Sequence, residues 1–88
     1  PLKFSLQQNY PNPFNPVTQI DFELPEEGNV NLSVYDLSGK LVSTLAYGQK
    51  TAGYYSISFD GSNLSSGLYF YRLQSGSVNL VKKMTLIR

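Results

Sequence analysis

Two acidic side chains, Asp21 and Glu23, have a spacing that carboxylate chemistry can use. They stand two positions apart where polar and apolar residues alternate, so on a strand both would face the same side, about 7 Å apart. Glycosidases use carboxylates at about this separation to protonate a leaving group and to activate water. Such an enzyme also needs a cleft that raises the pKa of one carboxyl group, and nothing around this strand predicts one. We therefore expect both residues to be solvated surface groups.

Other residue types that could do chemistry are missing or isolated. The chain has no histidine and no cysteine, which excludes a histidine base, a cysteine nucleophile, a disulfide and nearly every zinc site. Asp36 and Asp60 each precede a turn rich in serine and glycine, where an aspartate typically accepts hydrogen bonds from backbone N–H groups. A calcium site would need several more oxygen ligands at fixed spacing. We expect no enzyme activity, no cofactor and no metal.

The charge balance limits the partners. Seven Lys and Arg against six Asp and Glu give a net charge of +1, too balanced for electrostatic binding of nucleic acid. The charges are segregated along the chain, because five of the six acids lie within residues 21–36 and four of the seven bases lie within residues 72–88. No apolar run approaches the length of about 18 residues that suggests a membrane helix, so we expect no membrane insertion. Because the sequence begins with Pro1 and has no signal pattern, we expect it to be a piece of a longer chain.

The elements that position these residues are strands. Apolar residues recur at every second position between turn signals, and no window of helical length shows helical periodicity. We expect seven strands, at residues 3–8, 18–24, 29–37, 40–46, 54–59, 68–74 and 78–87. The 88 residues should therefore form one all-β domain, an immunoglobulin-like Greek-key sandwich of about seven antiparallel strands. A closed barrel is the alternative.

Alternation also assigns residues to the inside of the sandwich. The expected inward residues of the central strands are Leu32, Val34, Tyr55, Ile57, Tyr69 and Tyr71. A buried tyrosine needs a partner for its hydroxyl group, so we expect Tyr69 or Tyr71 to reach loop backbone.

The last strand breaks the alternation. Its inward residues should be Val78, Leu80, Met84 and Leu86, which leaves Lys82 out of step. We therefore expect a β-bulge, or emergence of the strand from the core, near Lys82 and Lys83.

Residues 9–16, with the sequence NYPNPFNP, form the least ordinary segment. The three prolines remove three backbone donors and restrict the loop. Tyr10 and Phe14 can then anchor it, and we expect Phe14 to fix the loop on the sandwich. The loop is either a rigid lid over one end of the sandwich or a preformed recognition surface, and one loop can be both.

Four aromatic residues are expected on outward faces: Tyr35, Tyr47, Tyr54 and Phe70. Exposed aromatic rings on a β-sandwich can stack on sugars, although the tryptophan common in such modules is absent here. A carbohydrate-binding or spacer module of a secreted enzyme therefore remains an alternative.

Five segments together resemble a known family. They are residues 6–18 (LQQNYPNPFNPVT), 34–39 (VYDLSG), 53–55 (GYY), 66–73 (SGLYFYRL) and 82–88 (KKMTLIR). In this order they resemble the C-terminal sorting domains of the type IX secretion system of Bacteroidetes and allied phyla. One departure is Arg88, where lysine is common. Immunoglobulin-like domains similar to those of flagellar hook-capping proteins share some of these segments and are structural modules.

The resemblance implies a function and a site. Such a domain is a non-catalytic sorting signal at the C-terminus of a cargo protein. The cargo protein is exported through the periplasm to the cell surface or the extracellular space. The domain is read by the outer-membrane translocon, and in many cargoes a surface sortase removes it. Our hypothesis for translocon recognition names Pro11, Asn12, Pro13, Phe14, Gly67, Tyr69, Lys82, Lys83 and Arg88. For Lys82 and Lys83 the alternative is that they protect an edge strand against pairing with other chains.

Overall fold

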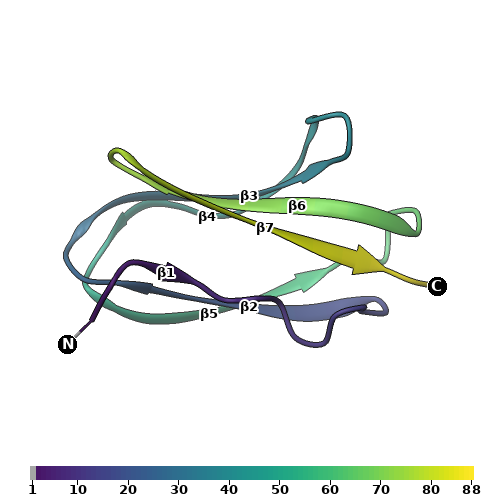
Figure 1. The fold of residues 1–88 in the computed structure, drawn as a ribbon, viewed down its shortest axis with the longest axis horizontal. Helices are drawn as coiled ribbons and strands as arrows, with labels where there is room; N and C mark the ends of the chain where they lie inside the picture. The colour runs from purple at the N-terminus through teal and green to yellow at the C-terminus, as the bar shows by residue number, and fades with distance from the viewer. Residues whose placement is uncertain (1) are drawn as a thin grey trace.

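Two antiparallel β-sheets stack face to face in the computed structural model of the chain (Figure 1). The structure describes residues 2–88, so Pro1, the first residue of the expected domain, lies outside the described part. The seven strands are β1 (Ser5–Leu6), β2 (Val17–Leu24), β3 (Gly28–Asp36), β4 (Leu41–Lys50), β5 (Gly53–Asp60), β6 (Gly67–Ser75) and β7 (Val78–Leu86). The first strand is shorter than expected, and β4 extends four residues further than expected. No helix in the described residues is long and apolar enough to span a membrane.

The strand order identifies the fold class. One sheet has the order β1-β2-β5 and the other the order β4-β3-β6-β7, which we call sheet A and sheet B. The chain changes sheets between β2 and β3, between β4 and β5, and between β5 and β6, so the β2–β5 and β3–β6 pairs interlock. The expected immunoglobulin-like Greek-key sandwich is confirmed. The closed barrel is not formed, because the two sheets are separate ladders.

Alternating side chains of both sheets fill the space between them. Leu32, Val34, Tyr69 and Tyr71 are buried as expected, and Phe22 of β2 stacks on Tyr55 of β5 with ring centroids 5.1 Å apart. Tyr55 and Ile57 face inward but are only half-buried, because β5 is an edge strand with a neighbour on one side. The buried hydrophobic core consists of Leu6, Phe14, Ile20, Phe22, Leu24, Val30, Leu32, Val34, Ala46, Phe59, Tyr69, Tyr71, Leu73, Met84 and Leu86.

Of the two alternatives expected near Lys82 and Lys83, a β-bulge or emergence of the strand from the core, the bulge is wrong. The β6–β7 register runs without a shift from Gly67↔Leu86 to Ser75↔Val78. Lys82 keeps its inward position and is half-buried, while Lys83 faces outward and is exposed. A lysine can occupy an inward position on an edge strand because its aliphatic stem covers apolar surface while its amine reaches water. The register shifts of the sandwich lie instead in the β3–β4 pair, next to Ser33 and Tyr35.

The β3–β4 turn shows the expected aspartate cap. Asp36 Oδ1 accepts hydrogen bonds from the backbone N–H of Ser38 at 2.9 Å and of Lys40 at 3.0 Å, and from the Ser38 hydroxyl at 2.7 Å. These bonds hold the pKa of Asp36 below its usual value, and the bond from the Ser38 hydroxyl has the largest effect. Gly39 has φ 88°, which glycine adopts readily. The turn between the two strands is thus fixed by its own side chains.

Candidate functional site

The proline-rich loop, residues 9–16, connects one end of the two sheets. On one side Tyr10 exchanges two backbone hydrogen bonds of 3.0 Å with Gln19 of β2. On the other side the N–H of Phe14 donates to the carbonyl of Thr85 at 2.9 Å, and the N–H of Ile87 donates to the carbonyl of Phe14 at 3.0 Å. All three prolines of the loop follow cis peptide bonds. The loop therefore joins the start of β2 in sheet A to the end of β7 in sheet B.

Phe14 fixes this loop in the core. Its side chain is 1% exposed and lies edge-to-face against Phe59, with ring centroids 6.1 Å apart. Gly61 lies so close that a Cβ atom there would be 3.2 Å from the Phe14 ring. The expected anchoring role of Phe14 is confirmed.

A buried polar cluster fastens the start of the loop. The Tyr71 hydroxyl accepts a hydrogen bond from the N–H of Asn9 at 2.7 Å and donates one to the carbonyl of Gln7 at 2.7 Å. The Asn9 side chain donates to Thr18 Oγ1 and to the carbonyl of Pro11, each at 3.1 Å. Burial raises the pKa of Tyr71 to about 12. Tyr69 in turn donates a hydrogen bond to the carbonyl of Ser65 at 2.6 Å. The expectation that Tyr69 or Tyr71 reaches loop backbone is therefore confirmed for both residues.

Asn9 and Thr18 of this cluster were not assigned to the site from the sequence. The available signal was the buried tyrosine of β6, which must find a polar partner. Which loop residue supplies that partner depends on how the loop crosses the end of the sandwich, and that crossing joins residues 62 positions apart.

Arg88, the last residue of the sequence, folds back onto the β5–β6 loop. Its Nη2 atom lies 3.1 Å from the carbonyl oxygen of Gly61 and also donates to the carbonyls of Ser62 and Leu64. At the start of the same loop, Asp60 accepts hydrogen bonds from the Ser62 hydroxyl and backbone, which lower its pKa, with a smaller contribution from the positive charge of Arg88. Three segments distant in sequence, the proline-rich loop, the β5–β6 loop and residues 85–88, thus form one end of the sandwich (Figure 1).

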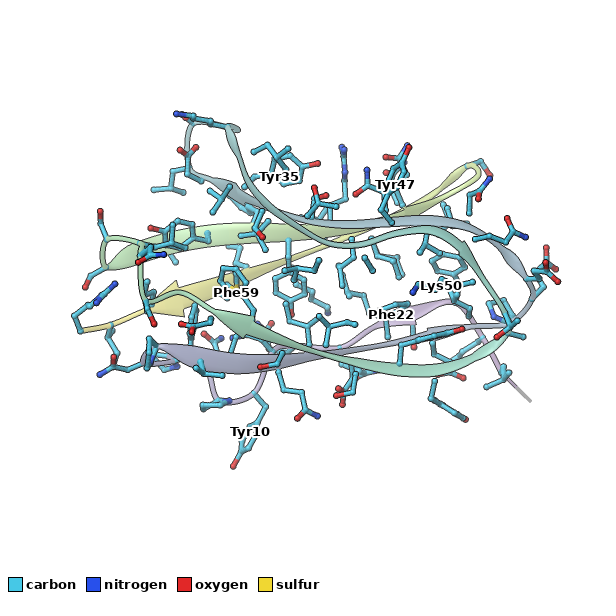
Figure 2. All side chains as sticks on the ribbon, turned by 180° about the vertical axis from the view of Figure 1, so that it is seen from behind. Tyr10, Phe22, Tyr35, Tyr47, Lys50 and Phe59 are labelled. Atoms are coloured by element: carbon cyan, nitrogen blue, oxygen red, sulfur yellow. The ribbon has the colours of Figure 1, made fainter. Side chains whose placement is uncertain are left out.

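Most of the residues expected in the site lie at this end, but they differ in accessibility. Phe14 and Tyr69 are buried, and the Asn12 side chain accepts a hydrogen bond from the Thr85 N–H at 3.0 Å. Lys82 is half-buried and lies further along β7. The exposed members are Pro11, Asn12, Pro13, Gly67, Lys83 and Arg88. The same loop also exposes Tyr10, to 81%, which was expected to anchor it and instead points into solvent (Figure 2).

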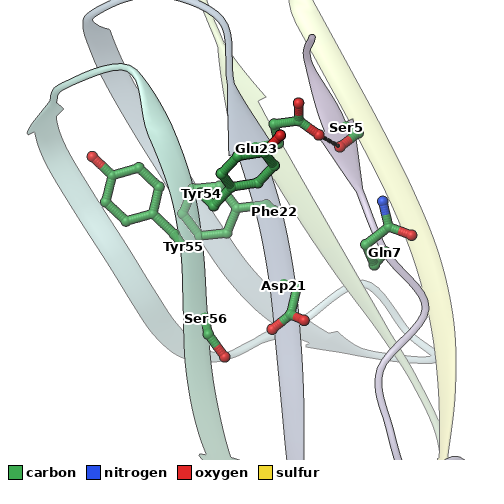
Figure 3. Close-up of a pocket in the computed structure, with 8 residues that line it drawn as sticks. All are labelled: Ser5, Gln7, Asp21, Phe22, Glu23, Tyr54, Tyr55 and Ser56. Carbon is green, nitrogen blue, oxygen red and sulfur yellow. Dashed lines mark hydrogen bonds between the residues drawn. The ribbon is translucent and has the colours of Figure 1, made fainter. Parts of the chain in front are cut away.

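A shallow groove of about 360 Å³ lies on the outer face of sheet A (Figure 3). Tyr54, which is exposed as expected, stands beside Glu23, and the remaining lining residues are Ser5, Gln7, Asp21, Phe22, Tyr55 and Ser56. Both carboxylates have surface partners, since Glu23 accepts from the Ser5 hydroxyl at 3.1 Å and Asp21 from the Gln19 side chain at 3.0 Å. Among residues 2–88 no three acidic side chains are grouped to hold a metal ion.

The comparisons with known proteins agree with the sequence segments and the fold. A family model described as a secretion system C-terminal sorting domain matches residues 8–87, from the residue before Asn9 to the residue before Arg88. No curated protein matches the chain. The family is generally non-catalytic. Because the match spans both sheets and the assembled end of the sandwich, the chain belongs to the family of C-terminal sorting domains of the type IX secretion system.

Proposed function

We propose that the outer-membrane translocon recognises this domain in its folded form. The recognised surface is the end of the sandwich that the proline-rich loop and residues 85–88 build. The observation that carries this proposal is the pair of backbone hydrogen bonds between Phe14 and the segment around Leu86. They hold the loop and the last strand as one surface. Its exposed groups are Pro11, Asn12, Pro13, Gly67, Lys83 and Arg88.

Buried members of the expected site have a different role in this proposal. Phe14 and Tyr69 have almost no surface with which to touch a partner. They act by positioning the exposed loop residues. Gly67 begins β6 with φ 150°, where a side chain would strain the backbone next to this surface. In this proposal the cargo precedes the domain in the parent chain, and a surface sortase removes the domain after export.

The test is a fusion of a signal peptide, a fluorescent reporter and this domain, expressed in a host with an intact type IX translocon. The parent domain should deliver the reporter to the cell surface or the medium. Replacing Arg88 by Gln together with Pro13 by Ala should reduce export, while Glu26→Gln at the opposite end should not. Retention of the parent reporter in the periplasm would contradict the sorting function, and full export of the loop variant would contradict the assigned surface.

The groove on sheet A favours a second candidate function, weak binding of a neutral sugar. Tyr54 offers a ring for stacking, and Asp21, Glu23 and Gln7 offer hydrogen-bonding groups around it. Titration of the domain with neutral oligosaccharides, followed by NMR shifts of Tyr54 and Ser56, tests this function. Shifts that persist in Tyr54→Ala would contradict it.

A further inference from the structure

The two sheets carry charges of opposite sign. The strands of sheet A contain three acidic residues and no basic residue, namely Asp21, Glu23 and Asp60. The strands of sheet B contain four basic residues, Lys50, Arg72, Lys82 and Lys83. The one acid in sheet B is Asp36, whose carboxylate is occupied by the β3–β4 turn. Two of these bases, Arg72 and Lys83, face outward, while Lys82 faces inward and Lys50 lies over the Tyr55 ring of sheet A. The outer face of sheet B is thus basic and that of sheet A acidic.

Apolar and aromatic side chains cross the outer surface of sheet B in one row. Tyr35 of β3 is paired with Leu41 of β4 and with Phe70 of β6, and Phe70 is paired with Lys83 of β7. Residues directly opposite one another on antiparallel strands hold their side chains on the same face, in contact. Leu41 is 53% exposed, so the row is open to solvent at its β4 end.

Further apolar groups widen this row into a patch. In the next row Val81, 55% exposed, is paired with Arg72, and Leu68 on the other side of Phe70 is also exposed. Figure 2 shows Tyr35 and Tyr47 on the outer side of sheet B, away from Phe22 and Phe59 in the core. We call the set Tyr35, Leu41, Leu68, Phe70, Arg72, Val81 and Lys83 the sheet B patch. It is mixed apolar and basic, and contiguous apolar surface of this kind is typical of interaction sites.

The centre of the sheet B patch is already ordered. Arg72 Nη2 donates a hydrogen bond of 3.1 Å to the Tyr35 hydroxyl, and the Arg72 guanidinium lies 5.3 Å from the centre of the Tyr35 ring. Tyr35 lies on β3 and Arg72 lies on β6, and these are the two central strands of the sheet. Tyrosine and arginine that are held in place before binding lose little freedom on association, and both types are frequent among the residues that dominate binding energy.

We propose that the sheet B patch is a docking surface for a protein of the export machinery that presents carboxylate groups beside apolar side chains. The proposal rests on the proposed sorting function and adds to it a second surface, on a face of the sandwich, which shares only Lys83 with the surface at its end. Charge complementarity defines the partner, because Arg72 and Lys83 point outward and the neighbouring outward positions of this sheet carry no free acid. The exposed aliphatic groups Leu41, Leu68 and Val81 favour a protein over an anionic polysaccharide, since they match an apolar interface core and not a layer of hydroxyl groups.

The same export reporter tests this surface with variants matched in charge and polarity. Arg72→Glu reverses the central charge, and Leu41→Ser combined with Val81→Ser removes apolar area from residues more than half exposed. The matched controls on the other side of the sandwich are Lys3→Glu and Val17→Ser. Each purified variant is first shown to melt like the parent. We expect both patch variants to lower the exported fraction about tenfold or more, and both controls to export like the parent.

The outcomes separate this proposal from the one on which it rests. If the parent reporter is not exported, the sorting function itself is contradicted. If the parent and both patch variants are exported equally, the docking surface is contradicted and the sorting function stands. If Arg72→Glu alone impairs export and also abolishes binding of the purified domain to lipopolysaccharide vesicles, the ligand is an anionic polysaccharide and protein docking is contradicted.

Discussion

The Tyr71 hydroxyl and the Asn9 backbone N–H form a hydrogen bond of 2.7 Å across 62 positions of sequence. The same hydroxyl donates to the carbonyl of Gln7. A fully buried tyrosine of β6 thus satisfies two backbone groups where the chain enters the proline-rich loop. Because the loop carries three exposed residues of the proposed site, Pro11, Asn12 and Pro13, this bond links the core of the sandwich to that site.

Removing the hydroxyl in Tyr71→Phe should destabilise the domain by about 1–3 kcal/mol, because the buried N–H of Asn9 loses its partner. Urea unfolding measures the loss. Tyr10→Phe is the matched control, since Tyr10 is exposed, and it should change the stability by less than about 0.5 kcal/mol. Equal midpoints for the two variants would show that the loop entry does not depend on Tyr71.

The stability of the domain should fall at alkaline pH through Tyr71. Its pKa is raised from 10.0 to about 12, so the fold favours the neutral phenol. The resulting stabilisation, at most about 2–3 kcal/mol, is fully present below pH 10 and is lost as the pH rises towards 12. Other groups titrate in the same range, so the measured quantity is the difference between the parent and Tyr71→Phe from pH 9 to pH 12. A difference that stays constant would contradict the coupling.

Local sequence rules predicted the sheets well. Alternation placed Leu32, Val34 and Tyr71 correctly, because successive side chains of a strand point to opposite faces and sheet A covers the inner face of the central strands β3 and β6. The same rule overestimated the burial of Ile57, since it does not reveal that β5 is an edge strand. It also failed at Lys82, where an edge strand accommodates a lysine at an inward position without a bulge.

The candidate site was predictable in its residues more than in their roles. Proline and asparagine in residues 9–16 predicted a rigid loop, and Phe14 was correctly assigned as its anchor. The assembly of this loop with Gly61 and Arg88 was not predictable, because it depends on the close approach of three loops far apart in sequence. Tyr10 and Phe14 illustrate this limit of sequence-based prediction, because both are aromatic residues of one loop, yet Phe14 is buried in the core and Tyr10 is exposed to solvent.

Gly61→Ala tests the contact between the β5–β6 loop and the proline-rich loop. A Cβ atom at Gly61 would lie 3.2 Å from Phe14 Cε2, 3.3 Å from Leu86 Cδ2 and 3.4 Å from the carbonyl oxygen of Pro16. Because this site is buried and well packed, we expect a loss of about 1–3 kcal/mol. Gly28→Ala is the control, since its Cβ atom would meet only Ser75 Oγ at 3.5 Å. Thermal unfolding of both variants measures the difference, and a Gly61→Ala protein as stable as the control would contradict this packing.

Phe14→Ala should destabilise the whole domain, not only its loop. The ring is almost fully buried and contacts Phe59 in the main core, so its removal should cost about 3–5 kcal/mol. Tyr10→Ala removes an aromatic ring from the same loop, but one that is exposed, and it should cost less than about 0.5 kcal/mol. Denaturant unfolding distinguishes the two variants. Increased proteolysis of the loop without a change in global unfolding would show that Phe14 belongs to a separate local unit.

Arg88→Ala should loosen the assembled end of the sandwich and leave the sheets intact. The guanidinium group binds carbonyl oxygens of Gly61, Ser62 and Leu64, and no other side chain is hydrogen-bonded to these three carbonyls in the described residues. Without the contacts of Arg88, local opening of this end should cost less free energy. Amide hydrogen exchange at Gly61, Leu64 and Ile87 should therefore become faster in the variant. Lys83→Ala is the control, since its exposed side chain faces away from this loop on the outer side of β7. Unchanged exchange in Arg88→Ala, with reduced export of the fused reporter, would assign Arg88 to direct contact with the translocon instead of to holding this end together.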